Sequence, residues 1–186
     1  MPRLLTCLLL LSVLGLGAAP AVAADMIDNP AYQQWAHFKV GSWSKMQQTM
    51  SAQDQEMHTT IEQKLTALDD TKAVVQMQVT MNVAGQTMTM PGHAMTIPAR
   101  IAKDDQKAQK VEATTKAGTE QVSVSGKTIQ CHWTEGTMRY QGSTFQGRWD
   151  TSAAVPGGMV KMNGTVEGDG QGGKIEMTLL DFESVK

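Results

Sequence analysis

Three methionines and one histidine lie close together in the sequence and could supply soft ligand atoms to a metal ion. Met88, Met90, His93 and Met95 place three thioethers and an imidazole within eight residues. Thioethers are soft ligands that select Cu(I), and imidazole also binds copper. This run therefore indicates a copper site, while Met88 and Met90 equally fit a strand whose methionines fill a core.

The adjacent residues Cys131 and His132 have the side-chain types of a nucleophile and its base. Neighbours on a strand point to opposite faces, so a strand here would keep these two side chains apart. A buried free cysteine is more often a small hydrophobic residue. The sequence has no G-x-S-x-G, H-E-x-x-H, C-x-x-C or phosphate-loop pattern, so we predict neither an enzyme nor a cofactor.

Methionine is unusually frequent, with 14 residues against 3 Phe and 2 Tyr. Its flexible, polarisable side chain fills irregular cores and also lines surfaces that accept varied apolar ligands. If the methionines share one face of a curved sheet, that face would bind such a ligand. The residues predicted to line it are Met77, Val79, Met81, Ile97, Ile129, Trp133, Trp149 and Met177.

The first 23 residues have the pattern of a secretory signal peptide. Arg3 precedes an apolar run from Leu4 to Leu16, and Ala21-Val-Ala23 fits a cleavage site before Ala24. We expect an exported product, periplasmic or extracellular, with residues 24–186 as a single domain. No later apolar run is long enough to predict a membrane-spanning segment in the mature chain.

The charge balance gives no sign of a nucleic-acid partner. Of 16 basic residues only Arg3 lies in the predicted signal peptide, and all 18 acidic residues lie outside it, which leaves a mature charge of about −3. Removal of Cys7 leaves Cys131 as the one cysteine, so no internal disulfide is expected.

Alternating apolar and polar residues recur along most of the chain. Residues 57–67 and 75–83 predict a long antiparallel hairpin, and similar short patterns continue to the C-terminus. Pro98 places its strand at an edge or a bulge. Pro156-Gly157 predicts a type II turn, and the change of parity after Leu179 predicts a bulge.

These patterns predict a mainly β fold with one short N-terminal helix. The strands, about 9–11 in number, would form a single curved antiparallel sheet, a half-barrel or open barrel. The helix would begin at Pro30, with Asn29 as its cap, and end near Gly41.

Several motifs resemble the sequences of a group of uncharacterised secreted bacterial proteins. They are Asn29-Pro30, Trp35, Phe38-Lys-Val-Gly-Ser-Trp43, Gly126-Lys127, Cys131, Trp149, Val155-Pro-Gly-Gly158, Val160-Lys161 and Leu179-Leu-Asp-Phe182. That group is similar to the lipoprotein-carrier half-barrel superfamily, to which the periplasmic carrier LolA belongs. The resemblance implies a half-barrel over most of the mature chain. The chain departs from that carrier in one respect: it is predicted to have one helix, whereas the carrier has several.

Together these observations favour an exported binding protein for a lipid-like or other apolar or amphipathic ligand. A periplasmic copper-binding protein that uses the Met/His run is the first alternative. A structural or interaction domain without a ligand is the second. The sequence makes no prediction of oligomeric state.

Overall fold

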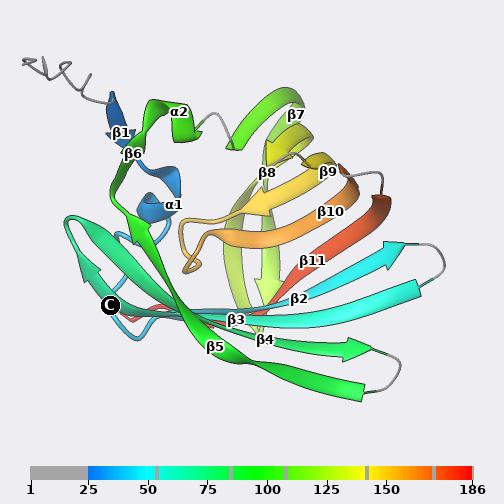
Figure 1. The fold of residues 1–186 in the computed structure, drawn as a ribbon, viewed down its shortest axis with the longest axis horizontal. Coiled ribbons are helices and arrows are strands. Elements are labelled where there is room, and N and C mark those ends of the chain that lie inside the picture. Colours follow the sequence, from blue (N-terminus) through cyan, green and yellow to red (C-terminus); the bar gives the residue numbers. More distant parts are fainter. Residues whose placement is uncertain are drawn as a thin grey trace, which may run out of the picture.

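The computed structural model describes residues 25–52, 55–83, 86–106, 109–140, 143–168 and 171–185 (Figure 1). The predicted signal peptide lies outside these residues. The described residues form eleven strands and two short helices. In chain order these elements are β1 (Met26–Asp28), α1 (Pro30–Gln33), β2 (Trp43–Ala52), β3 (Gln55–Asp69), β4 (Lys72–Val83), β5 (Gln86–Pro98), β6 (Arg100–Ala102), α2 (Lys103–Gln106), β7 (Gln109–Val124), β8 (Lys127–Tyr140), β9 (Ser143–Thr151), β10 (Met159–Gly168) and β11 (Gln171–Glu183).

Nine of the strands form one antiparallel sheet in the order β5-β4-β3-β2-β11-β10-β9-β8-β7. Hairpins join most neighbours, and β2 pairs with β11 to bring the two halves of the chain together. The edge strands β5 and β7 are not paired with each other, so the sheet stays open. β1 and β6 form a separate two-stranded sheet. The mainly antiparallel β prediction is confirmed, whereas the single sheet is replaced by two.

The predicted N-terminal helix is much shorter than expected. The Asn29 side chain caps α1 by accepting a hydrogen bond from the Ala31 N–H at 3.0 Å, and Pro30 occupies the first turn. The helix nevertheless ends at Gln33, and a segment of non-helical turns continues from Gln34 to Gly41. A second one-turn helix, α2, follows β6 directly. The single-helix prediction is therefore not confirmed.

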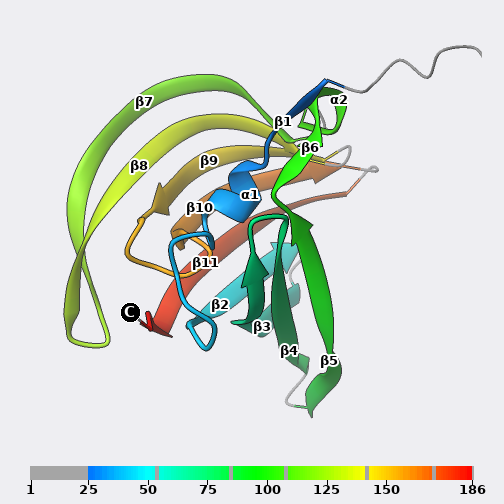
Figure 2. The same ribbon diagram turned by 90° about the vertical axis from the view of Figure 1, so that its left-hand side faces the viewer.

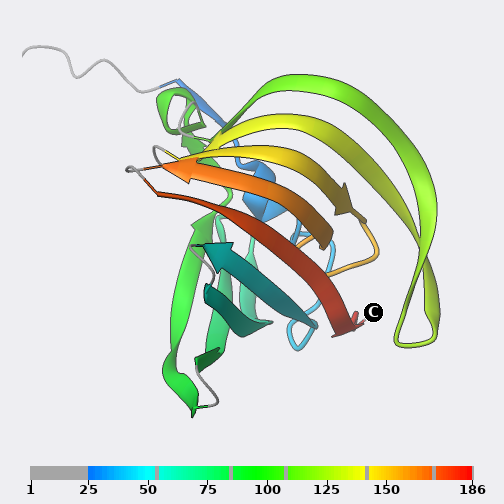
Figure 3. The ribbon, with the colours of Figure 1, turned by 90° about the vertical axis from the view of Figure 1, so that its right-hand side faces the viewer.

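The nine-stranded sheet bends strongly around the N-terminal segment. Figures 2 and 3 show β7 to β11 arching over the side on which α1 lies, with β2 to β5 forming the opposite wall. We call the side that contains α1 the concave face. Within the described residues, neither helix has the length and apolar content needed to cross a membrane.

Two clusters of buried side chains form the core. In the first, aromatic residues of α1 and the turn after it pack on β3, β4 and β5; its buried members are Tyr32, Trp35, Phe38, Leu65, Ala73, Val75, Ile97 and Ala99. The second joins the end of the β7–β8 hairpin to β2, β10 and β11; its buried members are Met46, Val124, Ile129, Cys131, Val155, Val160, Leu179 and Phe182. The Ser125 hydroxyl and the Lys127 ammonium donate to the carbonyls of Leu180 and Phe182, at 2.8 and 2.6 Å, and fix this hairpin against β11.

The predictions for local irregularities are confirmed. The β11–β2 register shifts between Leu179 and Asp181, which is the predicted bulge. Gly157 has φ +80°, as the second central residue of a type II turn requires. Pro98 ends β5, an edge strand, where its missing N–H breaks no ladder.

Candidate functional site

Methionine pairs cross the concave face of the sheet. Side chains that are directly opposite in an antiparallel pair share a face. Met46 of β2 is opposite Ile61, on the face that carries Leu65 and so packs against the α1 segment. The same face carries three pairs with methionine on both strands: Met50–Met57, Met81–Met88 and Met162–Met177.

Eleven of the 14 methionines project from this one face. The register places there Met46, Met50, Met57, Met77, Met81, Met88, Met90, Met95, Met138, Met162 and Met177. The other three are Met1, Met26 and Met159. Core filling alone does not account for this set, because only Met46 is fully buried, at 5% exposed. Most of the others are partly exposed, and Met88 reaches 53%.

The opposite face of the same strands is polar. Between Met46 and Met50 on β2, the residues that point the other way are Gln47 and Thr49, and their partners on β3 are Thr60 and His58. The Thr49 hydroxyl and His58 Nδ1 lie 3.1 Å apart in a hydrogen bond across the pair. Along β2 and β3 one face is therefore polar, whereas the concave face carries mostly apolar side chains, with Gln48 and Thr59 as the polar pair between the methionines.

Among the described residues, contacts between two loops cover one end of the concave face. The loop between β9 and β10 packs there against the turn that follows α1. The Gly157 N–H donates to the Gln34 carbonyl at 3.3 Å, and His37 Nε2 lies 2.8 Å from the Ala153 carbonyl oxygen. Toward the other end, Met90 and Met95 of β5 are 42% and 36% exposed. The methionine-lined part of the face is therefore accessible to solvent.

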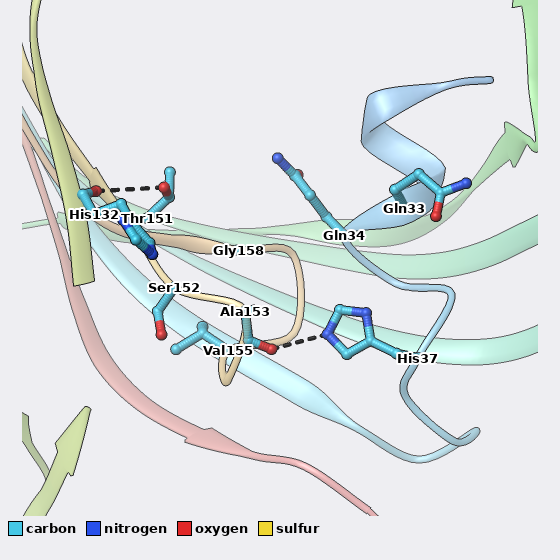
Figure 4. A pocket seen from close by; sticks show the side chains of 9 residues that line it. All are labelled: Gln33, Gln34, His37, His132, Thr151, Ser152, Ala153, Val155 and Gly158. Carbon is cyan, nitrogen blue, oxygen red and sulfur yellow. Dashed lines mark hydrogen bonds between the residues drawn. The ribbon is translucent and has the colours of Figure 1, made fainter. Parts of the chain in front are cut away.

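A cavity of about 330 Å³ lies beside the covered end (Figure 4). The turn after α1 contributes Gln34 and His37, and β8 with the β9–β10 loop contributes His132, Ser152 and Val155. The figure shows the His37 ring pointing at the Ala153 carbonyl oxygen. This hollow adds a small volume of mixed character next to the methionine-lined surface.

A row of three glycines permits the arch of β8, β9 and β10. Gly136 is opposite Gly147, which is opposite Gly164. A Cβ at Gly147 would lie 2.2 Å from the Asn163 carbonyl oxygen, and one at Gly164 would lie 2.3 Å from the Gln146 carbonyl oxygen. The ring of Phe145 covers both of these glycines. Glycine kinks of this kind allow a sheet to curve sharply.

The structure places five of the eight predicted ligand-lining residues on the exposed part of the concave face. They are Met77, Val79, Met81, Trp149 and Met177. Ile97 belongs to the first buried cluster and Ile129 to the second, at 7% and 6% exposed, so neither is free to contact a ligand. Trp133 is opposite Asp150, which places it on the other face from Trp149.

Trp133 instead belongs to an ionic network on the polar face. Arg148 donates from Nε to Asp150 at 2.9 Å and from Nη2 to Glu120 at 2.6 Å, and its guanidinium lies 4.8 Å from the centre of the Trp133 ring. These hydrogen bonds, first to Glu120 and then to Asp150, raise the pKa of Arg148. Asp150 is 1% exposed, so Arg148 compensates a buried carboxylate.

Cys131 and His132 do not form a catalytic pair. Cys131 is fully buried in the second cluster, whereas His132 is exposed and follows it on the same strand. Burial raises the pKa of the Cys131 thiol, and the negative charges of Asp150 and Glu120 raise it further. A protonated, inaccessible thiol is a poor nucleophile and a poor metal ligand.

The residues missed by the sequence interpretation come mainly from the second half of the chain. Met50, Met57, Met138, Met162 and Ile175 also project from the concave face. Their alternation was visible in the sequence, but only the pairing of β2 with β11 shows that the two halves share one surface. Among the described residues, no group of three or more His, Cys, Asp or Glu is placed to hold a metal ion.

Comparisons of the chain with protein-family models, with curated proteins and with solved structures found no match.

Proposed function

We propose that this is an exported, non-enzymatic binding protein that shelters an apolar or amphipathic, lipid-like ligand on its concave face. The observation that carries the proposal is the set of partly exposed methionines that cross the sheet on that one side. Flexible thioether side chains adapt to ligands of varied shape. A sheet with a polar outer face and an accessible, mostly apolar concave face suits a soluble carrier.

The expected affinity is moderate. Burial of each CH₂ contributes about 0.8 kcal/mol, so an acyl chain with about 15 covered methylenes gains roughly 12 kcal/mol. Association costs about 4 kcal/mol or more. The balance corresponds to a dissociation constant in the micromolar range for a long-chain fatty acid.

We further propose that the fold is a half-barrel related to the lipoprotein-carrier superfamily. The open edges β5 and β7 and the presence of α1 on the concave side support this relationship. The chain has much less helix than the lipoprotein carrier. We therefore propose a small lipid-like molecule as its ligand, rather than a lipoprotein. Removal of residues 1–23 would release the protein to the periplasm or the medium.

A pair of matched double variants tests the proposal. Met50 and Ile175 are directly opposite each other on the concave face, and Thr49 and Glu176 are the adjacent opposite pair on the polar face. We expect Met50→Gln with Ile175→Gln to weaken binding of a fluorescent fatty acid about tenfold, since two apolar contacts are replaced by amides that lose water on binding. Thr49→Gln with Glu176→Gln should leave the affinity unchanged.

Two further observations complete this test. Thermal unfolding must show that both double variants fold, and lipid extraction of protein purified from its own compartment should yield a co-purified apolar molecule. Equal losses of affinity in the two variants, or no binding by the wild type, would exclude the concave face as a ligand site. The remaining alternative would then be a structural or interaction domain.

A further inference from the structure

The register of β4 and β5 brings His93 opposite Met77. A bulge between Met77 and Val79 changes the parity of β5, so that Met90 and His93, three residues apart, project from the same face. Met95, opposite Val75, is the next residue on that face. His93 is therefore surrounded by methionines from its own strand and from the neighbouring strand.

The spacing suits a single ion. Directly opposite residues have Cβ atoms about 4.5–5.5 Å apart, which is within reach of one ion for the Met77 thioether and the His93 imidazole. Met90 is opposite Val79 and Met95 is opposite Val75, each about 6.6 Å along the sheet from the Met77–His93 pair.

Met88 lies outside this group. It is opposite Met81, four residues from Met77 along β4 and so about 13 Å away. Met90 and Met95 flank the Met77–His93 pair at half that distance, so an ion held by the pair is within reach of either of them and too far from Met88. The cross-strand partner Met77 therefore takes the place of Met88 in the Met/His run noted in the sequence.

We propose that Met77, His93, Met90 and Met95 form a binding site for Cu(I) on the concave face. Thioether sulfur and neutral imidazole are soft, uncharged ligands, which favour Cu(I) over Mg²⁺, Ca²⁺ or other oxygen-seeking cations. The side chains that share this face from Val75 to Met81 on β4 are all uncharged and apolar. His93 is exposed and Met95 is 36% exposed, so the ion reaches the site from solvent.

Anaerobic titration of the full mature protein with Cu(I), in competition with a chromophoric Cu(I) chelator, tests the site. We expect one equivalent to bind. Met77→Leu and His93→Leu should each weaken the affinity at least about tenfold, because each removes a ligand atom while the apolar volume is kept. Ag(I), which is not oxidised or reduced under these conditions, should show the same order of affinities by calorimetry.

Two variants on the same face serve as controls. Met162→Leu lies on β10, far from His93, and Met88→Leu removes the nearest thioether that the geometry excludes. Both should retain the wild-type affinity within about threefold. Wild-type protein that binds no Cu(I), equal affinities of Met77→Leu and wild type, or a loss in Met88→Leu as large as in Met77→Leu would each overturn the proposal.

The Cu(I) site and the lipid-like ligand are tested independently. His93 is not among the apolar residues proposed to contact the fatty acid, so His93→Leu should lose Cu(I) affinity and still bind the fluorescent fatty acid. Loss of Cu(I) binding with retained fatty-acid binding supports the metal site. If the wild-type protein does not bind the fatty acid, the proposed lipid-like ligand is excluded, and the Cu(I) titration still decides the metal site.

Discussion

Replacing Gly164 by alanine should destabilise the protein strongly, because the arch of β8 to β10 depends on the glycine row. The new Cβ would lie 2.3 Å from the Gln146 carbonyl oxygen and 2.7 Å from the Phe145 ring. The first of these neighbours is backbone, which moves only if the β9–β10 pairing shifts. Overpacking by a single methyl costs about 1–3 kcal/mol, and a backbone clash belongs at the upper end of that range.

Thermal and denaturant unfolding measure the effect. A loss of about 3 kcal/mol in the free energy of unfolding corresponds to a fall in Tm of roughly 6–12 °C for a domain of this size. Gly172→Ala is the matched control, since its Cβ would lie 3.7 Å from the Val166 carbonyl oxygen and 3.9 Å from Glu167 Cγ, which are ordinary van der Waals contacts. We expect that variant to change stability by less than about 0.5 kcal/mol. Equal stabilities of the Gly164 and Gly172 variants would refute this account of the curvature.

Three other predictions follow from the polar and titrating groups. Arg148→Gln should cost about 3–5 kcal/mol in denaturant unfolding, because Asp150 is left as an unpaired buried carboxylate, and adding Asp150→Asn should recover part of the loss. Cys131 should react with a thiol reagent at least about a hundredfold slower in native than in denatured protein, because its raised pKa and its burial keep the thiol neutral and covered. Hydrogen bonds, first from the Thr71 hydroxyl and then from the Thr71 N–H, lower the pKa of Asp69. Its contribution to stability is therefore present above the ordinary carboxyl pKa and lost as pH falls through the lowered value, so the Tm difference between wild type and Asp69→Asn should be largest near pH 7 and vanish in strong acid.

Alternation in the sequence was sufficient to predict the strands and the existence of one apolar face. It could not predict which strands share that face. Met50 and Ile175 are separated by most of the chain, and the pairing of β2 with β11 alone makes them neighbours. The bulge near Leu179 was predicted because parity changes there, whereas the bulge before His93 was not.

The accessibility of individual residues depended on tertiary packing. Ile97 has the alternation of a ligand-lining residue, but the aromatic side chains that follow α1 cover it. Trp133 and Trp149 both lie on strands predicted from alternation, but alternation within each strand does not show which residues share a face between strands. The β8–β9 register places the two tryptophans on opposite faces. The N-terminal helix was overestimated because Tyr32 and Trp35 keep a helical spacing through a turn that is not helical.

The most direct test of the central claim is an NMR titration of protein labelled at the methionine methyl groups. If the concave face binds a long-chain fatty acid, the acid shifts the signals of the methionines on that face, including Met50, Met81 and Met162. Met26 of β1 does not lie on the nine-stranded sheet and should remain unchanged. Saturable shifts confined to the concave set would support the binding role. Shifts of Met26 alone, or no shifts at all, would contradict it.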